Sequence, residues 1–368
     1  MWPCSVSCRT ALVLTFAVMT SMAAGCAVGP QKRGTAFESI LPSEAGYSEE
    51  KLKALEMLLQ ASGSESLLLL HEGKVFFSWG DVSRKRLVHS MRKALLNGLI
   101  GQCVAKGKLD LDATLAQMQV DDIMPSLSAA EKEATLLQVL QSRSGVYHEA
   151  AAESEGMAAQ RPARGSHAPG NHYYYNNWDF NVAGFLFEKH CGTDIYSAFD
   201  ERIARPLGMQ DWRKNITNAP ANGALPGADV DCFYQLEATR SRYPAYHFRL
   251  SARDLARYGQ LFLNRGRWGG RPIVPEAWIA ESTRPVSIID ARYGLAYGLL
   301  WDVLVPDSPQ EQASFFHTGA GVHMLGVYPK HKLVMVHRVN TEDGAPFDDG
   351  KLYAIIRAIH AARLKPGR

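Results

Sequence analysis

The stretch Ser90-Met91-Arg92-Lys93 lies at the start of a predicted helix and is the most informative part of the sequence about the fold. Residues three apart on a helix project from the same side, so the Ser90 hydroxyl and the Lys93 amine would be neighbours. The start of a helix also favours negative charge, because its first N–H groups are unpaired and the macrodipole is positive there. The stretch therefore predicts a hydroxyl nucleophile beside an amine that can take its proton.

The S-x-x-K spacing is weak evidence when it is taken alone. About one chance match is expected in a chain of this length, and Ser48-Glu49-Glu50-Lys51 is such a match. There we interpret Ser48 as the N-cap of a helix with acidic residues in its first turn. Ser90 admits the same interpretation, as a cap on a helix over 90–105. Two further motifs are needed to favour a catalytic serine.

The second motif, Tyr175-Asn176-Asn177, lies in an aromatic and amide-rich loop over 172–180. A tyrosine whose pKa is lowered by nearby positive charge could take a proton from Ser90 and later protonate a leaving group. Asn177 could orient both Lys93 and a substrate carbonyl. The alternative is an aromatic loop that packs on the core, with asparagine caps.

The third motif, His317-Thr318-Gly319, ends a predicted strand and is followed by Ala320. Small residues there let a strand edge approach a substrate, and a backbone N–H group can point into a site. We expect the backbone N–H groups of Ser90 and Ala320 to form an oxyanion hole. The alternative is an ordinary turn at the end of a strand, with a surface histidine.

In this order and at these separations, S-x-x-K, Y-x-N and H-T-G resemble the serine β-lactamase and penicillin-binding protein superfamily. The resemblance is to the branch related to class C β-lactamases, which includes family VIII carboxylesterases, D-aminopeptidase-like enzymes and 6-aminohexanoate-dimer hydrolases. It spans residues 45–360, and five shorter stretches support it: 107–112, 142–145, 175–184, 205–209 and 251–255.

The resemblance implies a role for each motif residue. Ser90 would be the acylated nucleophile, and Lys93 and Tyr175 the acid/base pair. The substrate-side wall would be formed by Asn177, His317, Thr318 and Gly319.

One position departs from the class C pattern, which has lysine where this chain has His317. A permanent positive charge there helps to bind the carboxylate of a β-lactam and to keep the tyrosine ionised, whereas histidine is mostly neutral at pH 7.5. The departure favours an esterase or amidase acting on uncharged acyl groups. The alternatives are a β-lactamase or D,D-peptidase acting on peptidoglycan peptides, and a non-hydrolytic penicillin-binding-like protein of the cell envelope.

The N-terminus predicts export. A short apolar run over 11–24 ends in Ala23-Ala24-Gly25-Cys26, which is typical of a signal over 1–26 and too short for a membrane span. Its end resembles a bacterial lipobox, so Cys26 is the expected lipidation site and the lipid the only expected membrane anchor. We expect the protein on the periplasmic side of a bacterial membrane, and Ala27 fits sorting to an outer membrane if the host has one. An ordinary secretory signal or an uncleaved anchor is the alternative.

The remaining cysteines do not predict a metal site. Cys103, Cys191 and Cys232 allow at most one disulfide within the mature chain and have no zinc-ligand spacing. We interpret them as small buried side chains. No metal or cofactor motif occurs, and neither H-E-x-x-H nor G-x-S-x-G is present. The expected partner is a small-molecule ester, amide or short peptide substrate.

The composition is typical of a soluble globular protein. The chain has 368 residues, 46% of them hydrophobic, which suffices for one large or two modest domains. The net charge is +3 and both signs are mixed throughout. Because no basic stripe or arginine-rich tail occurs, we exclude nucleic-acid binding.

Strand patterns lie at both ends of the chain around a helical middle. We predict helices over 48–61, 90–105, 130–141, 178–190, 195–205, 252–264, 275–282 and 346–363, and strands over 66–71, 74–79, 294–304, 314–318, 323–328 and 332–340.

These patterns predict an α+β fold of the β-lactamase and penicillin-binding protein type. An antiparallel sheet from both termini, flanked by helices, would be formed by 41–88 and 288–368. A mostly helical part over 89–287 would be inserted, and 27–40 would be a flexible tether. The active site would lie where the two parts join.

Overall fold

The first two strands, β1 (Ser64–His71) and β2 (Lys74–Gly80), form the predicted hairpin, and β1 also pairs with the last strand, β14 (Leu333–Val339). The computed structural model describes residues 34–219, 225–308, 310–343, 347 and 349–364. The sheet has eight strands in the order β2-β1-β14-β13-β12-β11-β10-β9. Each neighbouring pair is antiparallel, and the other strands are β9 (Ser287–Asp290), β10 (Leu295–Tyr297), β11 (Asp302–Leu304), β12 (Ser314–Gly319) and β13 (His323–Tyr328).

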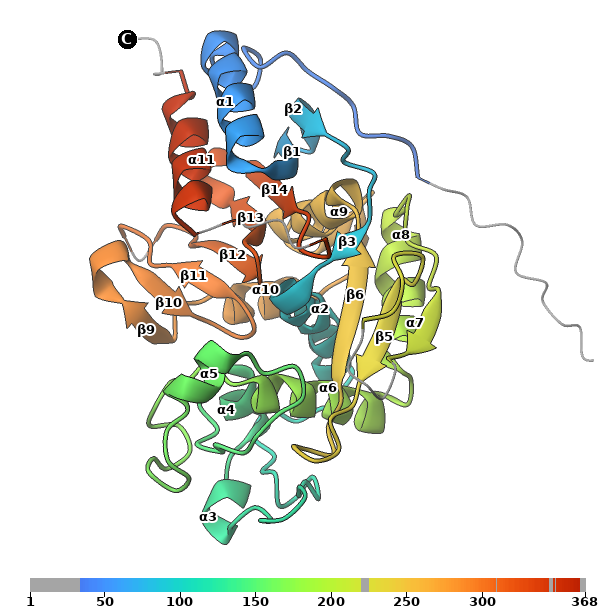
Figure 1. Cartoon of the computed structure of the whole chain (residues 1–368), viewed down its shortest axis with the longest axis vertical. Coiled ribbons are helices and arrows are strands. Elements are labelled where there is room, and N and C mark those ends of the chain that lie inside the picture. Colours follow the sequence, from blue (N-terminus) through green and yellow to red (C-terminus); the bar gives the residue numbers. More distant parts are fainter. Residues whose placement is uncertain (1–33, 220–224, 309, 344–346, 348, 365–368) are drawn as a thin grey trace, which may run out of the picture. The chain divides into compact units, whose positions relative to one another are not determined.

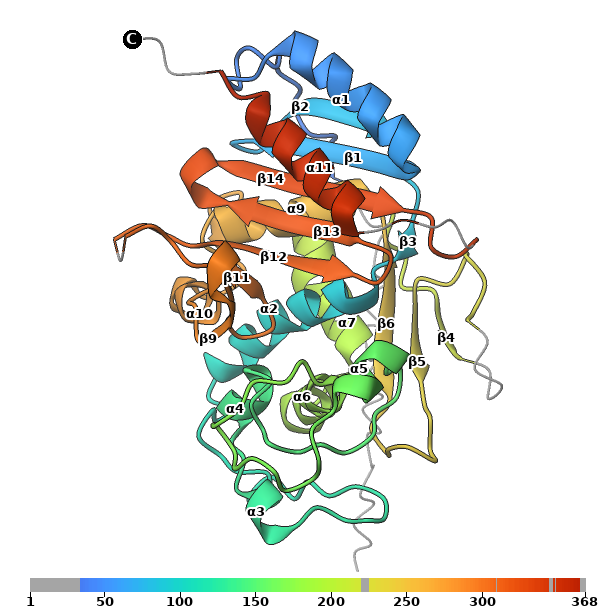
Figure 2. The ribbon, with the colours of Figure 1, turned by 60° about the vertical axis from the view of Figure 1, so that its left-hand side comes forward.

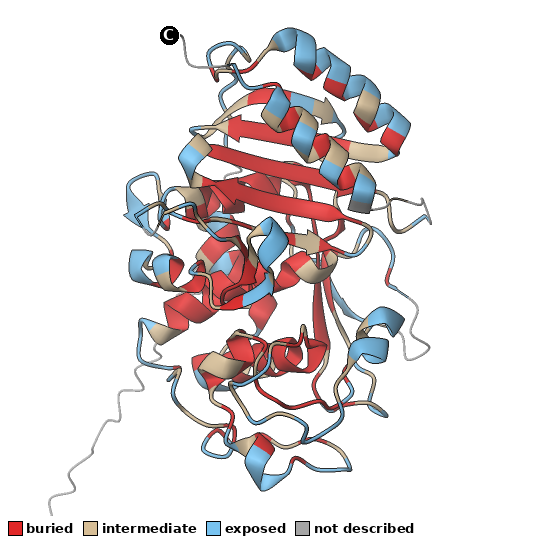
Figure 3. Cartoon of the chain, turned by 90° about the vertical axis from the view of Figure 1, so that its left-hand side faces the viewer, coloured by how far each residue is buried: buried red, intermediate tan, exposed pale blue. Residues whose placement is uncertain are grey.

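Helices cover both faces of this sheet (Figure 2). α1 (Glu49–Ser62) and α11 (Asp349–Ala361) lie on one face, and α9 (Ala252–Leu263) lies on the other. A strand that is covered on both faces does not need to alternate polar and apolar residues. Every residue of β13 and β14 is accordingly buried, and the two strands stand out among the buried elements in Figure 3.

The long helix α2 (Arg92–Val104) runs from the sheet into the helical part (Figure 1). Its residues from Arg92 to Cys103 are all buried, because it packs against helices and strands around its whole circumference. A short 3₁₀ turn, η1 (His89–Met91), precedes it. The other helices of this part are α3 (Ala129–Lys132), α4 (Leu136–Leu140), α5 (Glu155–Gln160), α6 (Asn177–Cys191), α7 (Ile195–Phe199), the π-helical η2 (Asp200–Ala204), α8 (Arg205–Leu207) and α10 (Glu276–Ser282).

The prediction of a single helix over 130–141 was wrong. The chain forms α3 and α4 there, because Thr135 starts a second helix as an N-cap and Gln138 completes a capping box with it. The predicted helix over 195–205 is likewise divided among α7, η2 and α8.

The helical part also contains a second sheet, which the sequence analysis did not predict. Its order is β3 (Arg86–Leu87), β6 (Ala245–Leu250), β5 (Cys232–Gln235) and β4 (Ile216–Asn218). These strands are two to six residues long, and the six residues of β6 are all buried although two of them are His247 and Arg249. A strand of that kind shows no alternation that a pattern search could find. A separate two-stranded hairpin joins β7 (Arg267–Trp268) to β8 (Arg271–Pro272).

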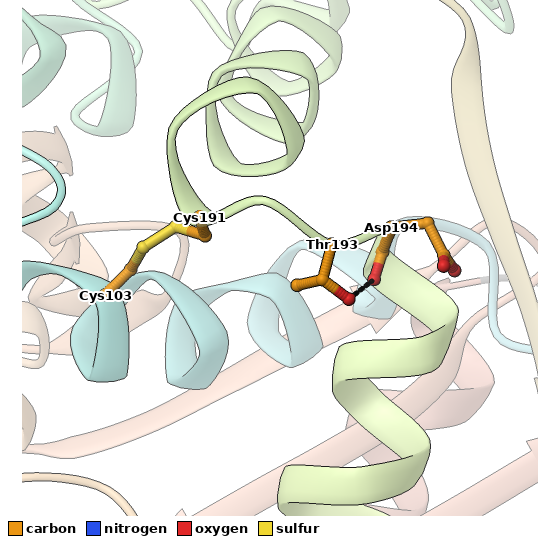
Figure 4. The surroundings of a disulfide bond; sticks show 4 residues. All are labelled: Cys103, Cys191, Thr193 and Asp194. Atoms are coloured by element: carbon orange, nitrogen blue, oxygen red, sulfur yellow. Dashed lines mark hydrogen bonds between the residues drawn. A yellow bond between two sulfur atoms is a disulfide. The ribbon is translucent and has the colours of Figure 1, made fainter. Parts of the chain in front are cut away.

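A disulfide joins Cys103 at the end of α2 to Cys191 at the end of α6 (Figure 4). Both residues are buried, as expected, and they form the one disulfide that the cysteine count allowed. The two cysteines are 88 residues apart, so only the packing of the two helices brings them together. Cys232 is buried and free, as expected.

Part of the predicted tether packs against the domain. The Gly34 carbonyl accepts a hydrogen bond from Gln210 Nε2 at 2.9 Å, and Ser39 pairs with Val75 beside the sheet. The Arg257 guanidinium lies 4.8 Å from the Phe37 ring. The predicted signal and Cys26 lie outside the described residues. Within the described ranges, no helix combines the length and the hydropathy that a membrane crossing would require.

Candidate active site

The structure brings Ser90, Lys93 and Tyr175 into one chain of hydrogen bonds. Ser90 lies in η1 and Lys93 in the first turn of α2, so the two side chains are one helical turn apart. Lys93 Nζ is 2.9 Å from Ser90 Oγ and 2.7 Å from the Tyr175 hydroxyl. Lys93 is fully buried, whereas Ser90 and Tyr175 are half-buried and can be reached from solvent. A nucleophile and its base are expected at these distances.

Two hydrogen bonds of the Ser142 hydroxyl hold the loop that carries Tyr175. The Ser142 hydroxyl donates to the Tyr174 carbonyl at 2.7 Å and accepts from the Asn176 N–H at 3.0 Å. Asn176 in turn caps α6, since its side chain accepts from the Trp178 N–H. Residues 142–145, which supported the resemblance, therefore fix the backbone on both sides of Tyr175.

Burial changes the pKa values of Lys93 and Tyr175 in opposite directions. It lowers the pKa of the Lys93 amine well below its usual value, and the neighbouring Arg92 lowers it further. It raises the pKa of the Tyr175 phenol, although hydrogen bonding to Ser90 and the charge of Arg92 act the other way. The expected lowering of the tyrosine pKa is thus not what the site has, because desolvation outweighs the positive charges. The lowered pKa favours the neutral form of the Lys93 amine and the raised pKa keeps Tyr175 protonated, which makes Lys93 the base in this pair.

His317 lies beside this pair as a neutral ring. Burial and the nearby Lys93 lower the pKa of His317 to about 3. Its Nδ1 is hydrogen-bonded to the Thr318 carbonyl at 2.8 Å, its Nε2 is buried without a partner among the described residues, and its ring lies 6.3 Å from that of Tyr175. No permanent positive charge therefore stands at this position.

The end of β12 approaches the residues before Ser90 so closely that only glycine fits at 319. A Cβ atom on Gly319 would stand 2.6 Å from the Val88 carbonyl oxygen and 3.1 Å from His89 Cβ. Ala320, the next residue, is exposed beside this contact. The predicted oxyanion-hole residues, Ser90 and Ala320, are thus each next to the point where the two segments meet.

Asn177 is buried near the site but makes a different contact from the one expected. Its Nδ2 donates to the Ala152 carbonyl at 2.6 Å, and its Oδ1 is buried with no partner in the described part of the chain. No hydrogen bond joins it to Lys93 among those residues. Thr318, on β12, is half-buried. An unpartnered buried acceptor such as Asn177 Oδ1 is available to a donor on a ligand.

A buried polar network behind the nucleophile was not predicted. Thr341 Oγ1 is 2.8 Å from His89 Nε2 and 3.1 Å from His323 Nε2, and Arg338 Nε donates to His323 Nδ1 at 3.1 Å. His89 directly precedes Ser90 and has a left-handed backbone with φ of 48°, which is unusual for a residue other than glycine. His323 pairs with Gly319 across the β12–β13 turn. One hydroxyl thus connects both segments that meet at the site.

Asp302, at the start of β11, is the charged residue that sequence reasoning missed. It lies opposite Tyr297 on β10 and Phe316 on β12, which directly precedes His317. Burial raises the pKa of Asp302 to about 7, and Lys93 partly opposes this shift. A signal was present, because Asp302 is the single charged residue between Gly294 and Leu304 in an otherwise apolar run.

Other residues considered at the sequence level have structural roles. Trp178 and Trp301 are fully buried in the core, and Trp178 Nε1 donates to Asp122 at 2.7 Å. Arg161 pairs with Glu153, and Arg164 with Glu131 at 2.6 Å. Across the described residues, no group of three or more His, Cys, Asp or Glu side chains is placed to hold a metal ion.

Comparison with known proteins identifies the same family over most of the chain. The sequence model of the Beta-lactamase family matches residues 66–359. A candidate 6-aminohexanoate-dimer hydrolase from Bacillus anthracis is 18% identical, with a TM-score of 0.65 over 91% of this chain and 90% of that one. A penicillin-binding protein homologue from Caulobacter crescentus is 18% identical, with a TM-score of 0.60 over 89% and 100%. A class C β-lactamase is 16% identical, with a TM-score of 0.60 over 87% and 97%.

Proposed function

Since this chain belongs to the Beta-lactamase family of serine hydrolases, we propose that it cleaves ester or amide bonds through an acyl-enzyme on Ser90. The observation that carries this proposal is the hydrogen-bonded chain from Ser90 through Lys93 to Tyr175. A binding protein would have no chemical need for an amine of lowered pKa in contact with a solvent-accessible serine.

Each proton in the reaction has a donor and an acceptor in this chain of residues. The neutral Lys93 amine takes the Ser90 proton while Oγ bonds to the substrate carbonyl carbon. The negative charge on the carbonyl oxygen is stabilised by the backbone N–H groups of Ser90 and Ala320. The Tyr175 hydroxyl protonates the leaving oxygen or nitrogen as its bond to carbon breaks, and the Lys93 ammonium returns a proton to Tyr175. A water molecule deprotonated through Lys93 and Tyr175 then releases the acid.

The neutral ring of His317 supports esters and simple amides rather than β-lactams as substrates. The carboxylate of a β-lactam would meet no permanent positive charge at this position, because the pKa of His317 is lowered to about 3. A carboxylate that loses its solvation without gaining a cation is bound poorly. β-Lactamase or D,D-peptidase activity is therefore the second candidate, supported by the family alone.

Export with a lipid on Cys26 belongs to the same proposal. Beyond the signal-like residues 1–26, the Cys103–Cys191 disulfide supports it, because such bonds persist in oxidising compartments such as the periplasm. Replacement of Cys26 by alanine should move the protein from the membrane fraction to the soluble fraction. Retention in the membrane would instead favour an uncleaved N-terminal anchor.

The test of the catalytic proposal is hydrolysis of p-nitrophenyl butyrate by the purified full chain and by Ser90→Ala. We expect steady turnover that Ser90→Ala abolishes, and Ser48→Ala is the matched control because Ser48 belongs to the other S-x-x-K stretch. A single burst of product would indicate acylation without deacylation, as in a penicillin-binding protein. Turnover that survives in Ser90→Ala would remove Ser90 from the mechanism, and no signal at all would favour a binding protein.

A further inference from the structure

We propose that Asp302 is a specificity residue that binds a positively charged group of the substrate beside the catalytic serine. The inference rests on the proposed function, and it names a substrate class, esters or amides with a cationic group, that the catalytic residues leave open. Asp302 does not take part in the bond changes.

The strand register puts Asp302 on the same face as Tyr297 and Phe316, and Tyr297 links it to the site. Residues directly opposite each other in an antiparallel pair have side chains on the same face, with Cβ atoms about 5 Å apart. Asp302 is opposite Tyr297, and the Tyr297 ring lies 6.1 Å from the ring of Tyr175. The carboxyl group is also close enough to Lys93 to raise the pKa of that amine.

The Asp302 carboxyl group has no partner of its own. It is half-buried, and no residue in the described ranges forms an ion pair or hydrogen bond with it. A carboxylate shielded from water without a cation is unfavourable, and such groups gather at functional sites. A bound cation would supply the missing partner.

A cluster of aromatic rings lies beside Asp302, with Tyr297 and Phe180 fully buried and Tyr173 half-buried. The Tyr297 ring lies 5.3 Å from the Tyr173 ring and 6.4 Å from the Phe180 ring. Lys93 Nζ lies 4.5 Å from the Phe180 ring, so the same aromatic cluster also borders the catalytic amine. Tyr173 is the accessible ring of this cluster, and an aromatic ring near a carboxylate suits ammonium groups, above all quaternary ones.

The charges around the site also favour a cationic substrate. His317 is neutral, so an anionic substrate group gains nothing there, whereas Asp302 favours a cation. The expectation of uncharged acyl groups came from His317 alone. With Asp302 included, the preferred substrates carry a positive charge, and the remaining question is on which side of the scissile bond it lies.

Two pairs of isosteric esters test this, because each pair differs only by nitrogen or carbon at one quaternary centre. Butyrylcholine and 3,3-dimethylbutyl butyrate place the centre on the leaving group. The p-nitrophenyl esters of 5-(trimethylammonio)pentanoate and 6,6-dimethylheptanoate place it on the acyl group. We expect a higher kcat/KM for the cationic member of at least one pair, by about tenfold or more.

In Asp302→Asn the ratio of kcat/KM between the cationic and the neutral ester of a pair should fall to about unity. Asp307→Asn, a matched change at an exposed carboxylate, should leave that ratio unchanged. The ratio within a pair cancels any change in Lys93 basicity, which affects both members equally. Calorimetry with Ser90→Ala and the p-nitroanilide analogues of the acyl pair measures the same preference as binding, without turnover.

The outcomes separate the two proposals. If neutral esters are hydrolysed through Ser90 but neither pair is discriminated, or if Asp302→Asn keeps the ratio, the assignment of Asp302 is wrong and the proposed function stands. If no ester is hydrolysed and Ser90→Ala binds neither anilide, the proposed function is wrong, and the assignment of Asp302, which rests on it, is wrong as well. A cationic preference in binding that Asp302→Asn removes would support Asp302 even without turnover.

Discussion

Lys93 illustrates how burial of a single residue can create a base. Its amine is enclosed by protein, lies 4.4 Å from the Tyr175 ring, and touches both Ser90 Oγ and the Tyr175 hydroxyl. Desolvation disfavours the ammonium form, so the pKa of Lys93 is lowered and more of the amine is neutral than in a free lysine at the same pH. The packing around Lys93 therefore provides both the position of its amine and the basicity that catalysis needs.

Replacement of Lys93 by arginine should abolish this base while it keeps a positive side chain. Arginine stays protonated in proteins and cannot take the Ser90 proton. We expect kcat for p-nitrophenyl butyrate to fall by about 10²–10⁴-fold. Lys51→Arg is the control, because Lys51 belongs to the second S-x-x-K stretch and caps the Ala361 carbonyl far from the site. A Lys93→Arg variant within tenfold of the wild type would show that Lys93 is not the base.

A second residue, His317, should control the pH dependence. Activity requires neutral Lys93, so kcat/KM rises with pH through the lowered pKa of Lys93. A lysine at position 317 would add a positive charge nearby, disfavour the Lys93 ammonium and lower that pKa further. His317→Lys should therefore move the low-pH limb of kcat/KM to lower pH, whereas the neutral His317→Gln should not. Identical pH profiles for both variants would remove His317 from the electrostatics of the site.

At the scale of elements, the site depends on how β12 meets the turn before α2. η1 supplies Ser90, β12 ends at Gly319, and Thr341 after β14 connects the two through His89 and His323. A Cβ on Gly321 would stand 2.0 Å from Thr341 Cγ2, so Thr341 also packs against the turn that carries Ala320. The two expected oxyanion donors thus share one supporting residue.

Thr341→Val should separate positioning from substrate binding. The substitution keeps the shape of the side chain but leaves the His89 and His323 nitrogens without their partner, a loss of about 1–3 kcal/mol. We expect a lower kcat with little change in KM, measured well below the unfolding temperature, because Thr341 does not touch substrate. Thr341→Ser keeps the hydroxyl and should restore kcat. Equal kcat values in all three proteins would mean that the network serves stability alone.

At the scale of the whole molecule, the disulfide ties the two helices that carry the motifs. Lys93 lies in the first turn of α2 and Ser90 in the turn just before it, Tyr175 precedes α6, and Cys103–Cys191 joins the far ends of both helices. A covalent link between segments 88 residues apart limits the freedom of the unfolded chain. The bond therefore stabilises the arrangement of α2 and α6 without touching the reacting groups.

Removal of the disulfide should reduce stability more than activity. The double variant Cys103→Ser and Cys191→Ser should lose about 2–5 kcal/mol of unfolding free energy under oxidising conditions. A reductant should lower the Tm of the wild type and leave that of the double variant unchanged, as followed by circular dichroism. If the reductant leaves the wild-type Tm unchanged, the bond contributes nothing measurable.

Long apolar or amphipathic segments were predicted well because their signal is local. The hairpin of β1 and β2, the strands β12 to β14, and the helices α1, α2, α6 and α9 agree with their predicted spans to within about two residues. The short strands of the second sheet were missed, since two to six residues with mixed polarity give no period. Helix α3 was merged with α4 because the Thr135 cap lies within a stretch whose other residues suit a single helix.

The sequence by itself determined the family and the sheet built from both ends of the chain. It also determined the three motifs, S-x-x-K, Y-x-N and H-T-G, whose residues meet at the site. These depend on residue identity, order and local spacing, which the chain carries directly. Only the tertiary structure decided the Cys103–Cys191 bond, the position of Asp302, the Thr341 network and the directions of the Lys93 and Tyr175 pKa values. Each of these arises from burial or from contacts between residues far apart in the chain. Neither burial of this kind nor such contacts produce a periodic pattern in the sequence.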